Sequence, residues 1–453
     1  EEHPAVQEAV AVVREDAPGQ PRIVAYVVPA PTGESWGQAI DEQQLHADQI
    51  SQWQTLYDDA YNRAADEQDA EFNTASWNSS YTGEPITAEE MQEFVDHTVQ
   101  RILDLKPQRI LEIGCGTGLL LVRLAPHCQL FTGADFAAGA LRGLRRHVDA
   151  LGSQLGQVNL LHRAADDFTG IEPGSHDTIV INSVLQHFPT VDYLVKVIEG
   201  SVATVGDGGR VFVGDVRSLS LLESFALSVE LFRSRNDVTI EQLRRGAQRR
   251  VSQDNELVVD PAFFLALQAH LPRVRRVDIW PKRGHHLNEL TRFRYDVVLH
   301  VGGPDTEQDV GSLPALEWRR DGLSVETLRR RLEAERPEFL RVLEVPNSRL
   351  ADVLATRAVL EENEALGTVG ELRESLRARP ADDTVDPEAL WALGDTLPYA
   401  VSLHWSGSET EGAFELRLVR HGARLPPKAQ APAAMPLPKP WRAYTNQPLQ
   451  AAL

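Results

Sequence analysis

The feature that most constrains this chain is a glycine triplet that directly follows an apolar run. Residues 111–118 read LEIGCGTG, with glycines at Gly114, Gly116 and Gly118. Glycines clustered in this way close a strand-to-helix turn where a bound molecule approaches the backbone more closely than a Cβ permits. The dinucleotide fingerprint requires G-x-G-x-x-G, and Leu119 occupies the position of its third glycine. The spacing of the glycines therefore argues against a dinucleotide-binding turn.

The residues on either side extend this pattern. The stretch 109–113 reads as a strand that carries Glu112, and 119–124 begins an apolar helix. A strand, E-x-G-x-G-x-G and a helix resemble the first motif of Rossmann-like S-adenosylmethionine methyltransferases. This resemblance implies that the turn bends beneath the methionine part and the ribose of the cofactor, whereas the alternative is a purely structural turn. The implied cofactor-binding residues are Glu112, Gly114, Cys115, Gly116 and Gly118.

Composition limits the classes of function. A chain of 453 residues has room for two or three domains. Its formal net charge of −21 argues against a nucleic-acid partner, and no signal peptide or run of eighteen apolar residues indicates a membrane. The two cysteines, Cys115 and Cys128, are too few for a disulfide framework or a zinc site and predict a cytoplasmic protein without a metal. Because the chain begins at Glu1 in mid-pattern, we expect a piece of a longer polypeptide.

Strand and helix patterns alternate after the glycine turn. This alternation predicts an α/β fold with a mostly parallel sheet. We expect a Rossmann-like seven-stranded methyltransferase sheet with an N-terminal helical cap, a helical insertion after strand five and a C-terminal α+β extension. The predicted strands are 109–113, 129–134, 158–162, 177–182 and 210–215, followed by the insertion 218–270 and an antiparallel closing pair, 275–280 and 294–301.

The flanking segments have different patterns. Two β-rich runs around a Pro-Gly turn predict a hairpin at the N-terminus, and helical periodicity follows before the sheet. The tail 425–440 is rich in proline and alanine, as in a linker. The predicted elements are strands 6–13 and 22–28, helices 46–63 and 87–103, helices near 324–342 and 350–378, and a second hairpin, 399–405 with 413–419.

Ligands of such sheets lie beyond the carboxyl ends of the strands, so these ends supply the candidate residues. Strand two ends at Asp135, whose carboxylate can accept both ribose hydroxyls, while Phe136 can flank the adenine. The alternative role of Asp135 is a helix N-cap. After strand three, Ala165 and Asp166 are candidates for the adenine amino group, with Asp167 as the alternative acid.

The end of strand four would pass closest to the sulfur that carries the methyl group. Asn182, Ser183 and Gln186 offer amide and hydroxyl groups to the cofactor or to a substrate carbonyl. His187 has an unperturbed pKa near neutrality, so it is the candidate that takes a proton. The alternative is an ordinary histidine on an exposed turn.

Further candidates follow strand five and flank the sheet. Mutual pairing and a substrate role are equal alternatives for Asp215 and Arg217. The loop between the last two strands returns to the same edge, and Glu289 or His286 is a second candidate base there. Tyr81 precedes the sheet and can close over the methionine carboxylate, with core packing as its alternative.

Five segments match one family in sequence order. WNSSYTGEPI, LEIGCGTGLLL, NSVLQHFP, VGDVRSL and NELTRFRYDVVLHVG resemble the methyltransferase domains embedded in the adenylation domains of nonribosomal peptide synthetases. The likeness runs from about residue 46 to 420, and the two ends of the chain resemble the adenylation domain on either side of such an insertion. The family more often has tyrosine where this chain has His187.

This resemblance implies a division of the chain into four parts. They are a fragment of the adenylation-domain C-terminal subdomain (1–35), a methyltransferase core with helical cap and lid (42–303), an accessory α+β extension (304–424) and a linker that returns to the adenylation domain (425–453).

The position of the insertion adds an expectation about chemistry. In the family, insertions at this late point are associated with methylation of the backbone nitrogen. The implied reaction converts S-adenosylmethionine to S-adenosylhomocysteine and methylates the α-amine of an aminoacyl thioester on the phosphopantetheine of a carrier domain. The implied partners are a peptidyl carrier protein domain, the adenylation domain of the same polypeptide and an MbtH-like protein. The alternatives are a C- or O-methyltransferase and a non-catalytic scaffold.

Overall fold

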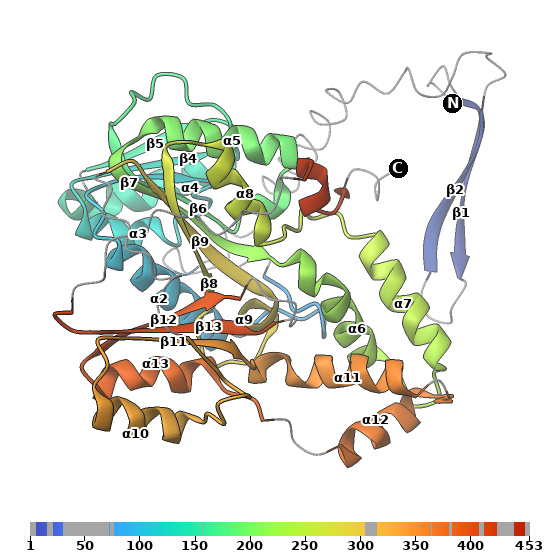
Figure 1. Ribbon diagram of the computed structural model, residues 1–453. Coiled ribbons are helices and arrows are strands. Elements are labelled where there is room, and N and C mark those ends of the chain that lie inside the picture. The colour runs from blue at the N-terminus through green and yellow to red at the C-terminus, as the bar shows by residue number, and fades with distance from the viewer. Residues whose placement is uncertain are drawn as a thin grey trace. The chain divides into compact units, whose positions relative to one another are not determined.

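The structure is a computed structural model that describes residues 6–15, 21–29, 72, 77–155, 157–303, 315–363, 365–379, 383–406, 412–423 and 439–448. The chain divides into two compact units, Glu1–Asp48 and Gln49–Leu453. In the described part of the first unit, β1 (Val6–Glu15) and β2 (Pro21–Pro29) form an antiparallel hairpin (Figure 1), which confirms the predicted one. The predicted helix 46–63 lies outside the described residues.

The larger unit contains a seven-stranded sheet of order β5-β4-β3-β6-β7-β9-β8 (Figure 1). Only β9 runs antiparallel to its neighbours β7 and β8, so the other six strands have their carboxyl ends at one edge. The chain order reverses between β3 and β6, the position where such sheets bind ligands. The predicted α/β class and the antiparallel closing pair are confirmed. The strands are β3 (Arg109–Ile113), β4 (Leu130–Asp135), β5 (Val158–His162), β6 (His176–Asn182), β7 (Val205–Arg217), β8 (Val274–Pro281) and β9 (Arg294–Val301).

Helices cover both faces of this sheet, because the central strands are apolar on both sides. In β7, Val211 and Val213 belong to one hydrophobic cluster, whereas Phe212 belongs to the cluster on the opposite face. This alternation follows the two-residue period of a strand. The first cluster includes residues of α5 (Val191–Thr204) and α8 (Ala262–His270), and the second includes residues of α2 (Ala88–Asp104), α3 (Leu121–Leu124) and α4 (Ala138–Leu151).

The predicted helical insertion follows β7. It comprises α6 (Leu222–Arg233), α7 (Ile240–Ser252) and α8. Thr239 caps α7 reciprocally with Gln242, as Thr87 does with Glu90 at the start of α2. Such capping boxes satisfy backbone donors that have no partner within the helix. None of the helices in the described ranges has an apolar stretch long enough to cross a membrane.

The accessory part contains a second sheet of order β10-β11-β13-β12. Its predicted hairpin is confirmed, whereas β10, β11 and the helix α13 were not predicted. The elements are β10 (Ala315–Glu317), α10 (Val325–Glu335), β11 (Phe339–Val345), α11 (Ala351–Glu362), α12 (Val369–Ala378), α13 (Pro387–Thr396), β12 (Tyr399–Trp405) and β13 (Phe414–Arg420).

Two predicted accessory helices are shorter than expected. The helix predicted at 324–342 ends at Glu335, because Arg336 takes a left-handed conformation with φ +46° and Pro337 follows it. The helix predicted at 350–378 is divided into α11 and α12, since Thr368 caps a new helix.

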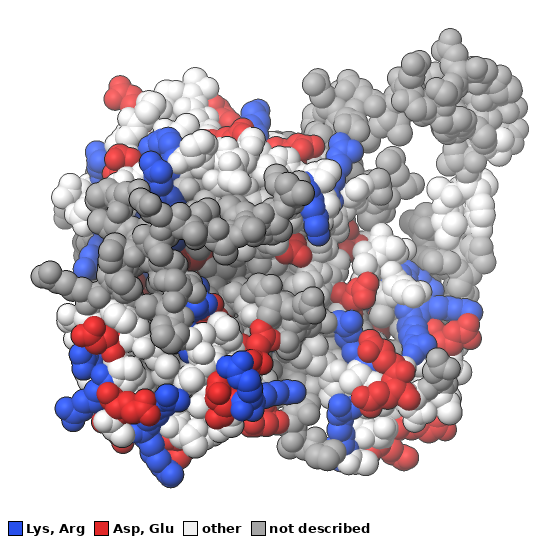
Figure 2. All heavy atoms as spheres, viewed as in Figure 1, with Lys and Arg blue, Asp and Glu red and all other residues white. Residues whose placement is uncertain are grey.

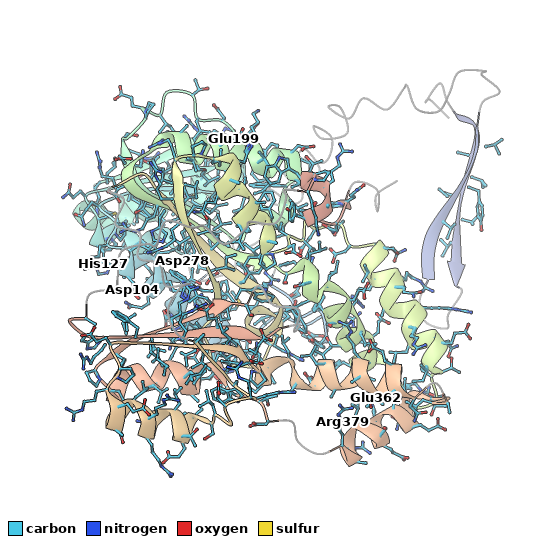
Figure 3. All side chains as sticks on the ribbon, in the orientation of Figure 1. Asp104, His127, Glu199, Asp278, Glu362 and Arg379 are labelled. Carbon is cyan, nitrogen blue, oxygen red and sulfur yellow. The ribbon has the colours of Figure 1, made fainter. Side chains whose placement is uncertain are left out.

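Surface charges are mixed on the face shown in Figure 2, where Lys and Arg side chains alternate with Asp and Glu. In α10, Arg330 lies 2.9 Å from Glu326. Arg379, which directly follows α12, lies 3.4 Å from Glu362 of α11, and both are labelled in Figure 3. Exposed pairs of this kind each contribute at most about 1 kcal/mol. The apolar clusters therefore supply most of the stability.

Replacement of Phe212 tests the assignment of β7 to the centre of the sheet. Its side chain is fully buried, so Phe212→Ala should leave a cavity and lower the free energy of unfolding by about 3–5 kcal/mol. Phe232 on α6 is 59% exposed and offers a matched control, since Phe232→Ala removes the same ring from the surface. Urea denaturation measures both variants. Equal stability losses would contradict the burial of Phe212.

Candidate functional site

The glycine turn lies at the carboxyl end of β3, as predicted. Gly114, Gly116 and Gly118 have φ angles of +77°, +51° and +88°. A Cβ on Gly114 would lie 2.2 Å from Cγ2 of Val184, and one on Gly118 would lie 2.3 Å from Cδ1 of Leu144. Both the backbone conformation and the packing of the turn thus require glycine.

Asp135, at the end of β4, holds this turn from the other side. Its Oδ2 accepts a hydrogen bond from the Gly116 amide at 2.8 Å, and its Oδ1 accepts one from the Ala137 amide at 2.7 Å. The residue is only 6% exposed. Asp135 is not the N-cap of α4, which was its predicted alternative, because Ala137 holds that position and no side chain of the described residues caps this helix.

The residues predicted to bind the adenine lie farther apart in sequence than those of the glycine turn, and one of them has protein partners. Both oxygens of Asp166 are engaged with α5, by the Tyr193 hydroxyl at 2.9 Å and the Lys196 ammonium at 2.6 Å. Phe136 and Ala165 are partly buried at the ends of neighbouring strands. The structure therefore places these residues at the expected edge but gives Asp166 protein partners.

Acceptor oxygens without partners occur at the carboxyl ends of three adjacent strands. Leaving a buried acceptor unpaired costs roughly 1–3 kcal/mol, so such atoms point to a ligand that supplies donors. Burial raises the pKa of Glu112 well above its usual value, and the nearby Asp135 adds to this effect. Among the described residues, these unpaired atoms are Glu112 Oε2 in β3, Asn182 Oδ1 at the end of β6, Gln186 Oε1 after β6 and Asp215 Oδ1 in β7.

His187 lies in the short helical turn η3 (Leu185–His187) and is partly buried. Burial lowers the pKa of His187 to about 4. The negative charge of Glu256 opposes this effect, and the positive charges of Arg294 and Arg217 reinforce it. The imidazole is therefore neutral at pH 7 and accepts a hydrogen bond more readily than a full proton. This environment does not favour the predicted role of His187 as a base with a pKa near neutrality.

Arg217 and Asp215 do not form the predicted mutual pair. The Arg217 guanidinium donates to Asp254 at 2.6 and 2.8 Å and to Glu256 at 2.8 Å. Asp215 Oδ2 accepts from Arg294 at 2.6 Å. The two carboxylates fix the Arg217 side chain in place. Arg217 therefore helps to order the residues at this side of the site. Sequence analysis missed Asp254, Glu256 and Arg294, because no local pattern links them to their partners.

A buried carboxylate connects this edge to the rest of the sheet. Asp296 of β9 accepts the Lys282 ammonium at 2.9 Å and the Asp215 amide at 2.9 Å, and it also pairs with Arg101 of α2. These contacts fix Asp215, which has a φ angle of +63°. Ser183, on the next strand end, has a φ angle of +58° and donates to Asp215 Oδ2 at 2.9 Å. Strained non-glycine residues of this kind cluster at functional sites.

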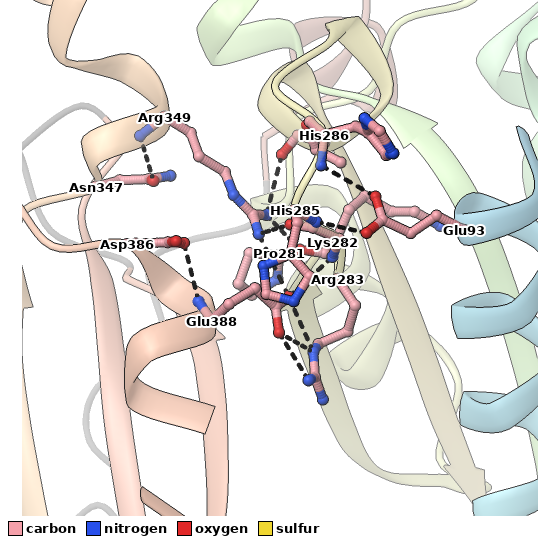
Figure 4. Close-up of polar contacts among 12 residues, drawn as sticks. Glu93, Pro281, Lys282, Arg283, His285, His286, Asn347, Arg349, Asp386 and Glu388 are labelled. Atoms are coloured by element: carbon pink, nitrogen blue, oxygen red, sulfur yellow. Dashed lines mark hydrogen bonds and ion pairs between the residues drawn. The ribbon is translucent and has the colours of Figure 1, made fainter. Parts of the chain in front are cut away.

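The loop after β8 is held on one side by α2 (Figure 4). Both carboxylate oxygens of Glu93 are used, by the His285 amide at 2.8 Å and the His286 amide at 3.0 Å. These bonds engage the loop backbone and leave the imidazole of His286 to other interactions.

On its other side this loop is held by the accessory part (Figure 4). The Glu388 carboxylate accepts from the Arg283 guanidinium at 2.7 Å and from the Gly284 amide at 2.8 Å. Arg349 donates to the Lys282 carbonyl at 2.6 Å. The accessory part thus shapes a loop at the site edge.

Two other predicted residues, Glu289 and Tyr81, form contacts that order the loop before the sheet. Glu289 is buried, and it accepts from the amide and the hydroxyl of Ser80 at 2.7 and 2.8 Å. The Tyr81 hydroxyl lies 2.8 Å from Ser228 Oγ, and burial raises the pKa of Tyr81. Both side chains therefore order the loop before the sheet, and the packing alternative for Tyr81 is observed. In the described part of the chain, no cluster of three or more His, Cys, Asp or Glu side chains is arranged to hold a metal ion.

The sequence of this chain is similar to a known protein family and to known proteins. The family model described as "Methyltransferase domain" matches residues 111–211, which contain the glycine turn and the end of β6. The chain is 40% identical over 467 residues to chondramide synthase cmdD of Chondromyces crocatus, a match that covers 99% of this chain and 11% of that protein. It is 30% identical to nonribosomal peptide synthetase asqK of Emericella nidulans over 357 residues, covering 77% of this chain and 14% of that protein. The chain thus spans about a tenth of the first relative.

One solved structure aligns with part of this chain. N-methyltransferase NodS of Bradyrhizobium japonicum, in complex with S-adenosyl-L-homocysteine, aligns with 55% of this chain and 99% of its own. The sequence identity is 15% and the TM-score is 0.35.

Substitution of Asp296 tests the buried connection. Asp296→Asn keeps the shape of the side chain but leaves Lys282 and Arg101 buried without a counter-charge, so the free energy of unfolding should fall by about 3–5 kcal/mol. Asp395→Asn, on the exposed surface of α13, is the matched control. Chemical denaturation at neutral pH measures both variants.

The pH dependence gives a second check on the same variant. The charges of Lys282 and Arg101 lower the pKa of Asp296 despite the opposing effect of burial. Its stabilisation is present above the unfolded pKa of about 4 and is lost as the pH falls further. The difference in the free energy of unfolding between the parent and Asp296→Asn should therefore become smaller in acid. If this difference does not change with pH, the stability lost in the variant is not electrostatic.

Proposed function

The chain is an S-adenosylmethionine-dependent methyltransferase that is homologous to segments of nonribosomal peptide synthetases, and from this premise we propose that it methylates the α-amine of an aminoacyl thioester. The observation that carries this proposal is the set of unpaired acceptor oxygens around a neutral imidazole. An amine supplies N–H donors to such acceptors. A neutral amine also attacks a sulfonium methyl group without a strong base, whereas carbon and hydroxyl nucleophiles must first lose a proton.

The residues present fit the cofactor. S-adenosylmethionine, when bound, supplies an electrophilic methyl group. The backbone of the turn Gly114–Gly118 and the carboxylate of Asp135, which lies against this turn, would hold its methionine part and ribose. Glu112 and Asn182 provide unpaired acceptors for its ammonium group. We keep Phe136, Ala165, Asp166 and Ser183 as proposed contacts.

The chain's own residues orient the substrate amine. When its nitrogen bonds to the methyl group, the bond from methyl to sulfur breaks, and the methylated ammonium then loses its proton to solvent. Asn182 and Gln186 present amide oxygens at the end of β6, beside His187. We propose that neutral His187 accepts a hydrogen bond from the amine and directs its lone pair toward the methyl group. Most of the acceleration of methyl transfer then comes from positioning of the amine. A weak general base would contribute only about 10²-fold. Glu289 and His286 remain second candidates as bases.

The proposed partners follow from the relatives. A peptidyl carrier protein domain would present the aminoacyl thioester on its phosphopantetheine, and the adenylation domain of the same polypeptide would activate the amino acid. An MbtH-like protein is a further proposed partner. The proposed division of the chain into 1–35, 42–303, 304–424 and 425–453 remains that of the sequence resemblance.

Intact mass spectrometry of a carrier protein loaded with an aminoacyl group tests the reaction. Incubation with the chain and S-adenosylmethionine should add one methyl group, and fragmentation should locate it on the α-nitrogen. A methyl group on carbon or oxygen would reject the N-methylation proposal. A scaffold would bind the cofactor but leave the carrier mass unchanged.

Asp135→Ala tests the cofactor assignment. Loss of the carboxylate should weaken the affinity for S-adenosylmethionine by about 1.5–3 kcal/mol. Because Asp135 also accepts two backbone amides, the variant should lose some stability as well. Asp149→Ala, on the exposed face of α4, is the control. Isothermal titration calorimetry on folded protein measures the affinity, and an unchanged dissociation constant would remove Asp135 from the cofactor site.

His187→Ala and Asn182→Ala test the roles at the end of β6. Each should slow single-turnover methylation by about 10–100-fold, because each removes an orienting acceptor. With its pKa lowered to about 4, His187 stays neutral from about pH 6.5 to about pH 9, so the parent profile should follow the substrate amine. The variants should therefore keep the parent midpoint. His187→Gln should recover part of the rate, and a midpoint that moves in His187→Ala would identify His187 as a titrating base.

A further inference from the structure

A short segment near the C-terminus of the described chain packs beside the candidate site. Residues Trp441–Tyr444 form the helical turn η7, drawn in red next to α8 in Figure 1. Tyr444 is buried in the main core cluster. The Trp441 ring packs edge-on against Phe263 and His270 of α8, with centroid distances of 5.3 and 5.4 Å. These aromatic contacts anchor the segment on the sheet's helical layer.

The next residues pair with an extended segment, 256–260, that leads into α8. We name residues 441–446 the C-terminal clasp. Its pairing satisfies backbone groups of 256–260 as a neighbouring strand would. The bonds run from the Asp260 amide to the Tyr444 carbonyl at 2.8 Å and from the Asn446 amide to the Val258 carbonyl at 3.3 Å, around an antiparallel bridge between Val259 and Thr445.

The side chain of Asn446 completes this pairing. Its Oδ1 accepts from the Val258 amide at 2.8 Å, and its Nδ2 donates to the Glu256 carbonyl at 2.8 Å. A primary amide supplies both a donor and an acceptor, so one side chain replaces a peptide group of an adjoining strand.

The opposite edge of 256–260 contacts the candidate site. The Leu257 amide donates to the Gln186 carbonyl at 2.8 Å, and the Val259 amide donates to the Arg217 carbonyl at 3.0 Å. Successive residues of a strand direct their backbone groups to alternate edges. This extended segment, buried at 257–259, therefore has the clasp on one edge and the site on the other.

The same segment carries a charge that acts on the site. The Glu256 carboxylate accepts from Arg217 at 2.8 Å, and its negative charge opposes the lowering of the His187 pKa. Asn446 holds the carbonyl of this residue. A displacement of residues 256–260 would therefore change the position of Arg217 and the electrostatic environment of the His187 imidazole.

We propose that Asn446 is a positioning residue for methyl transfer, acting through the extended segment 256–260 on Gln186, Arg217 and His187. The inference rests on the proposed function. Asn446 does not touch the reacting groups, and its contribution is to fix the segment that orders them. The clasp lies outside the residues matched by the methyltransferase family model, 111–211.

Asn446→Ala in the full chain tests the proposal in two ways. The kcat for methylation of a loaded carrier should fall about tenfold, because the orienting groups are less well fixed, while the KM for the carrier and the Kd for S-adenosylmethionine stay within about twofold. Hydrogen exchange of the Leu257 and Val259 amides should accelerate about tenfold or more. The exchange experiment needs no substrate, so it distinguishes failure of this inference from failure of the proposed reaction.

Two further variants sharpen the result. Asn446→Asp keeps the acceptor for the Val258 amide and loses the donor to Glu256, so its kcat should be intermediate. Gln447→Ala removes a neighbouring amide side chain from an exposed position and should behave as the parent. Parent-like kcat or parent-like exchange at Leu257 and Val259 in Asn446→Ala would overturn the proposal. A parallel loss of cofactor affinity and melting temperature would overturn it as well, since it would show a general structural role.

Discussion

The carboxylate of Asp296 joins the parts of the larger unit that form the site. It lies on β9, the one antiparallel strand of the sheet, and binds Lys282 at the end of β8, Arg101 of α2 and the amide of Asp215 on β7. A buried charge is tolerated only when its partners are well placed, so this carboxylate restricts how those elements can be arranged. Asp215 can retain its left-handed conformation because the surrounding contacts determine it.

The electrostatics of the site follow from burial more than from net charge. The chain carries a formal charge of −21, yet the cations near the site are paired with carboxylates of the protein, as Arg217 is with Asp254 and Glu256. The carboxylate and amide oxygens left without partners at the ends of β3, β6 and β7 are acceptors. They favour a positively charged cofactor and the proposed amine substrate, while burial keeps the imidazole of His187 neutral. Orientation of an amine that is already nucleophilic requires no stronger base.

Local patterns in the sequence were sufficient to predict the central sheet. Its strands are apolar with clear turn signals between them, and the glycine turn has a specific spacing, so both could be placed within one or a few residues. Accessory strand β11 was assigned to a helix, because it continues a helical pattern and only Arg336 and Pro337 interrupt it. The cofactor-side candidates, such as Asp135, came to the predicted edge because strand ends have a defined place in this topology.

Contacts between distant parts of the chain could not be predicted in the same way. Glu256 reaches Arg217 across 39 positions, and Asn446 reaches Val258 across 188. Neither pair has a periodic signature. The low pKa of His187 likewise depends on burial by residues from several elements, which a sequence read one segment at a time does not reveal.

The clasp has a consequence for protein engineering, where synthetases are recombined by exchanging whole domains. A boundary placed after β13, in the proline- and alanine-rich tail, would look suitable from composition. It would nevertheless remove the partners of the Val258 amide and the Glu256 carbonyl and expose the aromatic surface of α8 around Phe263. A transplanted domain should instead retain the residues through Asn446, so that the recipient chain is joined beyond the last strand pairing of the donor.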